Sequence, residues 1–413
     1  MLKRRVVVTG MGVKSSVGNS ISEFFDGLKN GKNGIKPISF IDVLDFAVSV
    51  AAYDYDFDPL KYFSRKEIRR MDRFSQFAVA ATKDALEEQK DILNFHDPYK
   101  VGIIFSSGIG GFTTVETEHE KFLQKGADSV SVFFIPMMIS NIAAGLISIE
   151  TGFKGDSASI ATACASSSNA IGEAFRKIRD GYLDAAITGG SEAGISLFTL
   201  AGFYNMCALS DSKDEDSASI PFDKRRNGFV MGEGAGVLFL EELELAKKRG
   251  AEIFGEIVGY GATTDAYHIT KPDPKSYAQQ KAIENALKDA NISLDLIDYV
   301  NAHGTSTKIN DLTETNTLKS CFKEHAKNLL ISSTKSMTGH MLGAAGAVEA
   351  IATILSLKEG IAPPTIGLKE KDEMCDLFYT PNVAVAKNMR YAISSSFGFG
   401  GHNAVLCFKK FEG

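Results

Sequence analysis

Cys164 stands where an expected strand over residues 159–163 gives way to an expected helix, a position that favours a reactive thiol. Unpaired backbone N–H groups and the helix dipole stabilise a thiolate at a helix N-terminus, so we expect the thiol pKa to lie below its free value of ~8.5. The small residues beside it leave room for a substrate and leave N–H groups free to bind an oxyanion. Cys164 is therefore a candidate nucleophile, and the alternative is a buried structural cysteine.

His303 and His340 occupy the same kind of position as Cys164. His303 follows an expected strand over residues 297–301, and His340 lies between an expected strand over 330–333 and an apolar helix. Open α/β sheets bind ligands beyond the carboxyl ends of their strands. A single histidine at such a place is more often a structural hydrogen-bonding residue, but the three positions together indicate one shared catalytic site.

Lys335 and Glu349 are ionisable residues in apolar surroundings, the first at a strand end and the second on an otherwise apolar helix. Burial of either charge alone is costly, so we expect the two to pair; the alternative is that Glu349 faces solvent. Phe399 lies between glycines in residues 397–402, a pattern typical of a hinged gate beside a ligand or of a plain tight turn.

The rest of the chain must position these residues, and it alternates expected strands with expected helices, as α/β proteins do. Further strands are expected over residues 3–9, 101–105, 184–188, 253–260, 391–395 and 404–408, and helices over 64–90, 277–290 and 311–321. The strand, loop and helix around Cys164 and those around His340 suggest an internal duplication, although the residue identity between them is too low to demonstrate it. No long linker divides the chain.

Composition excludes several classes of function. The 413 residues are 44% hydrophobic and carry a net charge of -6, which allows a sizeable core in two or three domains and gives no overall attraction for nucleic acid or an anionic membrane. The valine run near the N-terminus is too short for a secretion signal. The most apolar later stretch, residues 343–357, contains a glutamate and is too short to span a membrane.

Cysteine spacing and missing motifs narrow the classes further. The five cysteines are odd in number, widely spaced and never arranged as CxxC, which argues against a disulfide framework and a zinc site and favours the cytoplasm. The glycine-rich dinucleotide, P-loop, HExxH and GxSxG patterns are absent from the sequence. His96, His119 and His325 lie among charged residues and are expected at the surface.

A series of motifs runs through nearly the whole chain: Val8–Gly12, Arg70–Phe74, Thr162–Ala165, Pro221–Asp223, Arg226–Phe229, Gly232–Gly234, Asp265–His268, His303–Thr307, Lys335–His340 and Phe397–Gly401. Together and in this order they resemble the β-ketoacyl-acyl-carrier-protein synthases, closest to the elongating type II condensing enzymes of fatty acid synthesis. The resemblance implies a thiolase-like α/β fold, in which two duplicated halves form five α-β-α-β-α layers. Residues 1–251 would carry the nucleophilic cysteine and 252–413 the two catalytic histidines, and a homodimer is implied.

The resemblance also implies a mechanism. Cys164 accepts an acyl chain from acyl carrier protein, malonyl-acyl carrier protein loses CO2, and the resulting carbanion attacks to give a β-ketoacyl chain two carbons longer. The backbone N–H groups of Cys164 and Phe399 form the oxyanion hole. His303 and His340 stabilise the enolate through Nε2, with a second role for His303 in activating a water. No cofactor is implied beyond the phosphopantetheine of the carrier protein.

Further site residues follow from the same resemblance. Lys335 holds the local charge balance with Glu349, and the other supporting residues are Asp311 and Glu314. The substrate-binding residues are Thr305 and Thr307 for the phosphopantetheine arm, Thr270, and Ile109, Phe133, Phe134 and Phe203 for the acyl chain, with Phe399 as its gate. Carrier-protein docking is expected at a basic cluster, whose alternative is a solvated helix face: Arg65, Lys66, Arg69 and Arg70.

The chain departs from many relatives at Cys207, Leu312 and His402, where those have arginine, lysine and threonine. The first change would weaken contact with the carrier protein, and the others leave the Cys-His-His set intact. Two other functions stay open. A ketosynthase of a polyketide or specialised lipid pathway has the same active site, whereas a non-catalytic subunit like a chain-length factor lacks the nucleophile and is disfavoured by Cys164.

Overall fold

The computed structural model describes residues 3–43, 46–87 and 92–413. In this part of the chain one ten-stranded mixed sheet runs in the order β10-β9-β13-β14-β8-β1-β7-β6-β4-β5. Its strands are β1 Val6–Ser15, β4 Val101–Ser106, β5 Ser157–Ala158, β6 Ala185–Glu192, β7 Gly234–Glu242, β8 Gly255–Thr264, β9 Tyr299–Asn301, β10 Leu330–Ser332, β13 Tyr391–Gly398 and β14 His402–Lys409. Two-residue strands form two small ribbons, β2 Lys36–Pro37 with β3 Val50–Ala51 and β11 Ile361–Ala362 with β12 Val385–Ala386.

The large sheet is built from two halves with one topology. In each half the third strand in chain order lies at the outer edge, followed by the second, fourth, fifth and first. The second strand is parallel to its two neighbours, and the fifth is antiparallel to the fourth and the first, in both halves. The two first strands, β1 and β8, pair antiparallel and join the halves. This repeat confirms the internal duplication that the sequence suggested.

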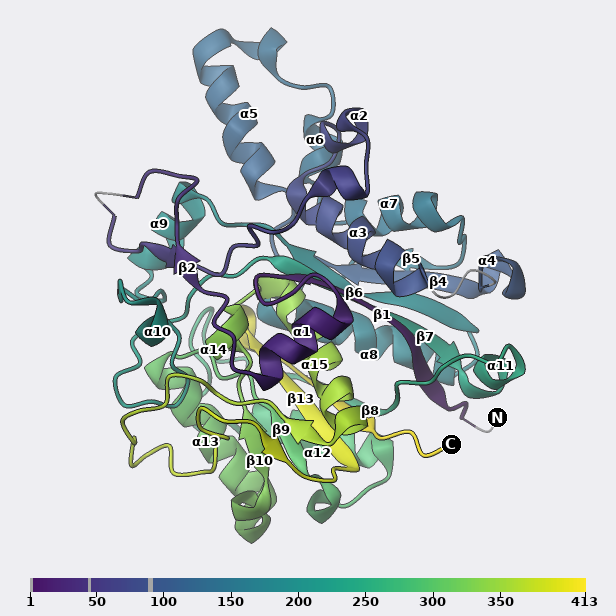
Figure 1. The fold of residues 1–413 in the computed structure, drawn as a ribbon, viewed down its shortest axis with the longest axis vertical. Coiled ribbons are helices and arrows are strands. Elements are labelled where there is room, and N and C mark those ends of the chain that lie inside the picture. The colour runs from purple at the N-terminus through teal and green to yellow at the C-terminus, as the bar shows by residue number, and fades with distance from the viewer. Residues whose placement is uncertain (1–2, 44–45, 88–91) are drawn as a thin grey trace.

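The two halves of the sheet form two layers, and helices form three more (Figure 1). Helices α8 (Ser166–Arg179) and α15 (Ala345–Glu359) contact each other and strands of both halves, so they form the middle layer. Helices α3 (Arg73–Glu87) and α7 (Ile142–Thr151) cover the outer face of the first half. Helices α12 (Tyr277–Ala290) and α13 (Lys308–Phe322) cover that of the second. The predicted five-layer thiolase-like order is therefore confirmed.

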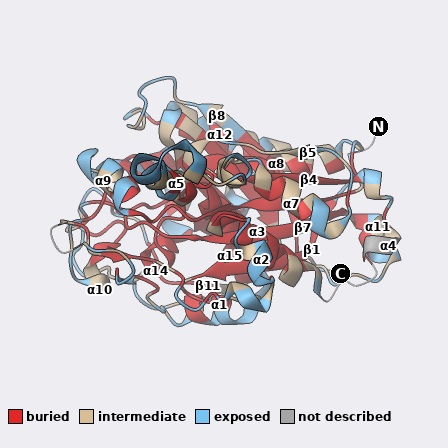
Figure 2. Ribbon diagram, turned by 90° about the horizontal axis from the view of Figure 1, so that it is seen from above, coloured by how far each residue is buried: buried red, intermediate tan, exposed pale blue. Residues whose placement is uncertain are grey.

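Strand alternation explains why the layers hold together. On β7, Leu238 and Leu240 belong to the core around α8 and α15, whereas Val237 and Phe239 face the core under α3. Successive side chains of a strand point to opposite faces, so a strand covered on both sides must be apolar at every position. Figure 2 shows the result, with buried residues throughout the sheet and exposed residues at the periphery.

The remaining helices lie around these layers, and α5 projects away from them (Figure 1). They are α1 Ile21–Lys29, α2 Arg65–Ile68, α4 Ile92–Phe95, α5 Phe112–Lys125, α6 Phe134–Met138, α9 Leu197–Asn205, α10 Glu215–Ala218, α11 Leu243–Lys248 and α14 Lys335–Thr338. None of the helices within the described residues is both long enough and apolar enough to cross a membrane.

The strand expected over 3–9 is shifted, because β1 spans Val6–Ser15. Two other predicted elements differ further from the structure. The helix expected over 64–90 is interrupted between α2 and α3, where the Asp72 carboxylate accepts the N–H of Phe74 and begins a new helix; residues 88–90 lie outside the described part. The strand expected over 159–163 does not form, because β5 ends at Ala158 and Ala163 adopts a positive φ of 50°.

The surface prediction for three histidines was correct only for His119, which is exposed. His96 is buried, and its Nε2 lies 2.8 Å from an oxygen of Glu241, which is itself buried. His325 is half-buried and hydrogen-bonds the carbonyl of Ile297. Charged neighbours in sequence misled the prediction, because the partner of His96 comes from a strand 145 residues away.

Candidate active site

Cys164 lies in a 3-10 turn, Ala163–Ala165, that leads directly into α8. The end of β13 packs against this turn so closely that a Cβ on Gly398 would lie 3.0 Å from the Cys164 nitrogen. Only glycine fits this approach. The contact brings the N–H of the next residue, Phe399, to the Cys164 sulfur, to which it donates a hydrogen bond. Two backbone N–H groups, those of Cys164 and Phe399, therefore lie beside the sulfur.

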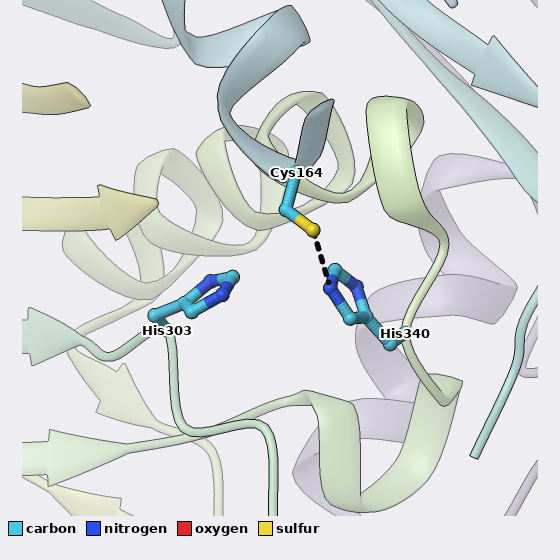
Figure 3. A group of neighbouring side chains, drawn as sticks. All are labelled: Cys164, His303 and His340. Carbon is cyan, nitrogen blue, oxygen red and sulfur yellow. Dashed lines mark hydrogen bonds between the residues drawn. The ribbon is translucent and has the colours of Figure 1, made fainter. Parts of the chain in front are cut away.

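The two histidines reach Cys164 from the other half of the molecule (Figure 3). His340 follows α14, and its Nε2 lies 3.1 Å from the Cys164 sulfur. His303 follows β9, and the possible ligand atoms of the three side chains all lie within 4.8 Å of one another. The imidazole rings are 5.4 Å apart and nearly perpendicular, at 85°. The predicted clustering of the three residues is confirmed by this geometry.

Hydrogen bonds to the far nitrogens define the tautomer of each ring. Nδ1 of His340 accepts the N–H of Leu342 at 3.3 Å, and Nδ1 of His303 lies 3.3 Å from the ammonium of Lys335, which has only donors. Burial and the Lys335 charge hold the pKa of both histidines well below 6.5, so both rings are neutral. The single ring proton is then on Nε2 in each case. The two histidines therefore present Nε2–H hydrogen-bond donors to the cavity. A metal ion would instead need a free lone pair on Nε2, so these tautomers do not suit metal binding.

Lys335 and Glu349 form the predicted ion pair deep in the second half. The ammonium contacts a Glu349 carboxylate oxygen and donates to the His303 carbonyl at 2.7 Å. Both side chains are buried, which rules out a solvent-facing Glu349. Burial raises the pKa of Glu349 to about 7, and the neighbouring Lys335 charge opposes that rise. The ion pair with Glu349 thus keeps the positively charged Lys335 ammonium beside His303.

The expected lowering of the Cys164 pKa was wrong. Burial raises the pKa of this thiol to about 11, and the opposing effects of the Lys335 charge and the Phe399 N–H are smaller. The side chain is only 7% exposed, so a thiolate loses more hydration than the N-terminus of α8 restores. The sulfur is a thiol at neutral pH in this state, and its proton must leave when the sulfur attacks.

Glu314 and Asp311 support the loop that carries His303. The Glu314 carboxylate accepts the N–H groups of His303 and Gly304 at 2.8 and 2.7 Å. Asp311 accepts the N–H of Phe222 at 2.8 Å on an adjoining segment. Both acids are buried and accept backbone N–H groups, and Asp311 also lies 3.4 Å from the Arg226 guanidinium, so neither belongs to the Cys-His-His group itself.

Glu192, at the end of β6, is a site residue that sequence reasoning missed. Its carboxylate accepts the Ser107 hydroxyl and the N–H groups of Gly108, Ile109 and Gly343 at 2.8 to 3.3 Å. It thus ties the loop after β4 to the loop that carries His340. The sequence contains a signal for Glu192, because an acidic residue at the end of an apolar strand is as unusual as Glu349 on the apolar helix α15.

A cavity of about 430 Å³ opens at Cys164. Of the predicted substrate-binding residues, those that line it are Ile109, Phe203, Thr270, Thr305, Thr307 and Phe399. Phe133 and Phe134 do not line it: they lie at the start of α6, where the Arg70 guanidinium sits 4.8 Å from the Phe133 ring. The cavity at Cys164 therefore does not include them, and their predicted role in acyl binding stays a prediction.

The predicted docking residues Arg65, Lys66, Arg69 and Arg70 are all exposed on α2 and the turn after it. Among the positions that depart from many relatives, Cys207 lines the cavity and is exposed with a positive φ of 54°. Leu312 and His402 are half-buried and lie outside the Cys-His-His group.

Known proteins share this chain's sequence and fold. Residues 3–246 match the family described as "Beta-ketoacyl synthase, N-terminal domain", and residues 254–369 match "Beta-ketoacyl synthase, C-terminal domain". A relative from Synechocystis sp. (strain ATCC 27184 / PCC 6803 / Kazusa), named 3-oxoacyl-[acyl-carrier-protein] synthase 2, is 48% identical over 411 residues, 99% of each chain. A relative of the same name from Staphylococcus aureus (strain COL) is 47% identical over 409 residues, again 99% of each.

A solved structure has the same fold over the same length. It is a type II polyketide synthase acyl-carrier protein in complex with its ketosynthase bound to the hexaketide, AntDE:AntF. The superposition gives a TM-score of 0.92 at 32% identity and covers 99% of this chain and 100% of that one.

Proposed function

This chain belongs to the β-ketoacyl synthase family, and on that premise we propose that it is an elongating β-ketoacyl-acyl-carrier-protein synthase. It is an acyltransferase that condenses an enzyme-bound acyl group with malonyl-acyl carrier protein and lengthens the chain by two carbons. The observation that carries the proposal is the Cys164, His303 and His340 cluster, with all three ligand atoms within 4.8 Å in one cavity.

The first half-reaction is acyl transfer to Cys164. The sulfur attacks the acyl thioester carbonyl, the carrier thiol leaves, and the thiol proton of Cys164 passes to that leaving group. The negative charge that develops on the carbonyl oxygen needs donors fixed in advance. The backbone N–H groups of Cys164 and Phe399 lie beside the sulfur and suit this role. Phe399, at the wall of the cavity, would gate the acyl chain.

The second half-reaction uses the two histidines. Malonyl thioester loses its carboxylate as CO2, and the electron pair that remains forms an enolate whose oxygen accepts the Nε2–H groups of His303 and His340. The enolate carbon then attacks the acyl carbonyl, the bond to sulfur breaks, and Cys164 leaves as thiolate. Because Nε2 of neutral His303 already carries the proton, this nitrogen has no lone pair with which to activate a water.

The proposal is tested by intact-mass spectrometry after incubation with acyl-carrier-protein thioesters of graded length. Cys164→Ala should form no acyl-enzyme, whereas His340→Ala should be acylated normally and fail to elongate with malonyl-acyl carrier protein. The wild-type mass shift would also report the preferred chain length. A covalent acyl group on Cys164→Ala would overturn the assignment of the nucleophile.

Acyl carrier protein is the proposed partner, docking at Arg65, Lys66, Arg69 and Arg70, which are exposed and positively charged. The phosphopantetheine of the carrier is the only prosthetic group required, and Thr305 and Thr307 would bind it at the cavity wall. The related AntDE ketosynthase is bound to its own acyl-carrier protein. Neither nucleic acid nor membrane is a proposed partner.

A homodimer and a cytoplasmic location complete the proposal. The short strand β5 forms an outer edge of the large sheet, and helix α7, which contacts β5, carries the exposed apolar side chain of Ile149. An open edge beside apolar surface suits pairing with a second copy. The five cysteines are free, as expected in a reducing compartment. We divide the halves at residues 1–251 and 252–413.

A further inference from the structure

Gln279 is a buried amide in the substrate cavity that the mechanism above does not use. It lies in the first turn of α12, is 0% exposed, and lines the cavity together with Thr305 and Thr307. The other three amides of the cavity wall donate to carboxylates: Asn403 to Asp265 at 2.7 Å, Asn310 to its neighbour Asp311 at 3.2 Å, and Asn227 to Asp211. Gln279 differs from all three because no carboxylate among the described residues hydrogen-bonds to it.

Only one end of the Gln279 amide is hydrogen-bonded. Oε1 lies 2.8 Å from the Thr317 hydroxyl on α13, and that hydroxyl lies 2.9 Å from the Thr313 carbonyl. Nε2 has no hydrogen-bond partner among the residues that the structure describes. If the amide is turned over, Nε2 donates to Thr317 and Oε1 becomes the free atom. In either orientation one polar atom of a buried amide lacks a partner.

The unpaired atom of the Gln279 amide does not contribute to the structure around it. The Thr317 hydroxyl can donate to the Thr313 carbonyl with or without Gln279, so loss of the amide leaves Thr317 satisfied. An unpaired buried polar group is unfavourable, and native proteins retain one where a ligand or an ordered water completes its hydrogen bonding. The position in the cavity wall favours a ligand.

We propose that the free amide atom of Gln279 hydrogen-bonds an amide of the phosphopantetheine arm. The inference rests on the proposed function, which brings that arm past Thr305 and Thr307, whose hydroxyls lie 3.0 Å apart. Each amide of the arm offers one carbonyl and one N–H, so either orientation of Gln279 finds a complementary group. Gln279 is thus a positioning residue that holds the carrier arm in register and does not touch the reacting atoms.

The test compares two malonyl thioesters on acylated enzyme: malonyl-pantetheine, which carries amides, and a malonyl thioester of a plain alkyl thiol of similar length. Gln279→Leu should lower kcat/KM for the pantetheine thioester about fivefold, the effect of one lost hydrogen bond, and leave that for the alkyl thioester unchanged. Its Tm should be unchanged or higher, because an unpaired amide is removed.

Gln280→Leu is the matched control, since the same change falls on the next residue, whose Nε2 donates to Ser276 at 2.9 Å outside the cavity wall. It should leave the ratio of the two thioesters as in wild type. Equal losses on both thioesters with a lowered Tm would assign Gln279 a structural role, and no loss on either would mean that water completes the amide; both results overturn the inference. Failure of the proposed function is distinguishable, because wild-type enzyme would then form no acyl-Cys164.

Discussion

The two halves of the molecule have one topology but contribute different chemistry to their shared site. The loop after the third strand delivers Cys164 in the first half and His340 in the second, and these meet at 3.1 Å. The loop after the second strand carries Ile109 in the first half and His303 in the second. Duplication therefore placed equivalent loops opposite each other, and divergence gave one half Cys164 and Ile109 and the other the two histidines, whose Nε2–H groups are hydrogen-bond donors.

The buried charges differ in the same way. Glu349 is the fifth residue of α15 and pairs with Lys335, whereas Ala170 is the fifth residue of α8 and carries no charge. Beside the site, the buried acid of the first half is Glu192, which is satisfied by a hydroxyl and backbone N–H groups rather than by a cation. Beside the site, the second half therefore places the Lys335 ammonium next to His303, whereas the first half places a carboxylate without a cation between two loops.

The largest expected effect comes from breaking the ion pair of the second half. Lys335→Ala leaves Glu349 buried without its cation, and we expect the free energy of unfolding to fall by about 3–5 kcal/mol in chemical denaturation. The double variant Lys335→Ala with Glu349→Ala should regain part of that loss, because no isolated charge remains. A single variant no less stable than the double would contradict the contrast between the halves.

Glu192 gives the corresponding effect in the first half, as a dependence on pH. Burial raises its pKa to about 7 from 4.5, so its protonated form is favoured in the folded state. This contribution to stability is complete below pH 4.5 and is lost as the pH rises through 7, about 3 kcal/mol in all.

Glu192→Gln cannot ionise, so its free energy of unfolding should rise relative to wild type between pH 4.5 and 7. Denaturation series at several pH values measure the difference, with Glu373→Gln at an exposed position as the control. Parallel profiles for wild type and Glu192→Gln would show that this carboxylate does not titrate as the structure indicates.

A smaller effect is expected at the acyl side of the first half. A Cβ on Gly194 would lie 2.5 Å from Cδ1 of Ile109, which must then move toward the cavity. Gly194→Ala should therefore shift the ratio of long-chain to short-chain acyl-enzyme about five- to tenfold toward short chains, read by intact mass. Gly202→Ala, where a Cβ meets nothing within 4 Å, should leave the ratio unchanged. If adding Ile109→Ala to Gly194→Ala restored long-chain acyl-enzyme, the effect would be assigned to the displaced Ile109 side chain.

The smallest effect concerns docking, which we assign to the first half alone. Charge reversal at Arg65 and Lys66 should raise the KM for acyl carrier protein two- to fivefold at low salt, by an amount of about 1 kcal/mol at most. The kcat/KM for malonyl-pantetheine, which has no protein to dock, should not change. The double change Lys247→Glu with Lys248→Glu on α11, where both residues are exposed, alters the net charge equally and is the control. An equal loss with malonyl-pantetheine would place the damage in the active site instead.

Sequence alone was sufficient to place Cys164, His303 and His340 in one site and to pair Lys335 with Glu349, and the family resemblance supplied the order of the layers. The first two predictions rest on local signals: a position at the start of a helix or just after a strand, or a charge in an apolar run. Such features can be predicted from sequence because they depend on residues only a few positions apart in the chain.

Only the tertiary structure decided the rest, because burial and partners depend on segments far apart in the chain. It raised the Cys164 pKa rather than lowering it, placed Phe133 outside the cavity, and brought Glu192 against a loop 151 residues away. It also left the Gln279 amide half satisfied in a wall built from α12 and α13. No pattern within one segment can report how much water its neighbours exclude or which hydrogen bonds they complete.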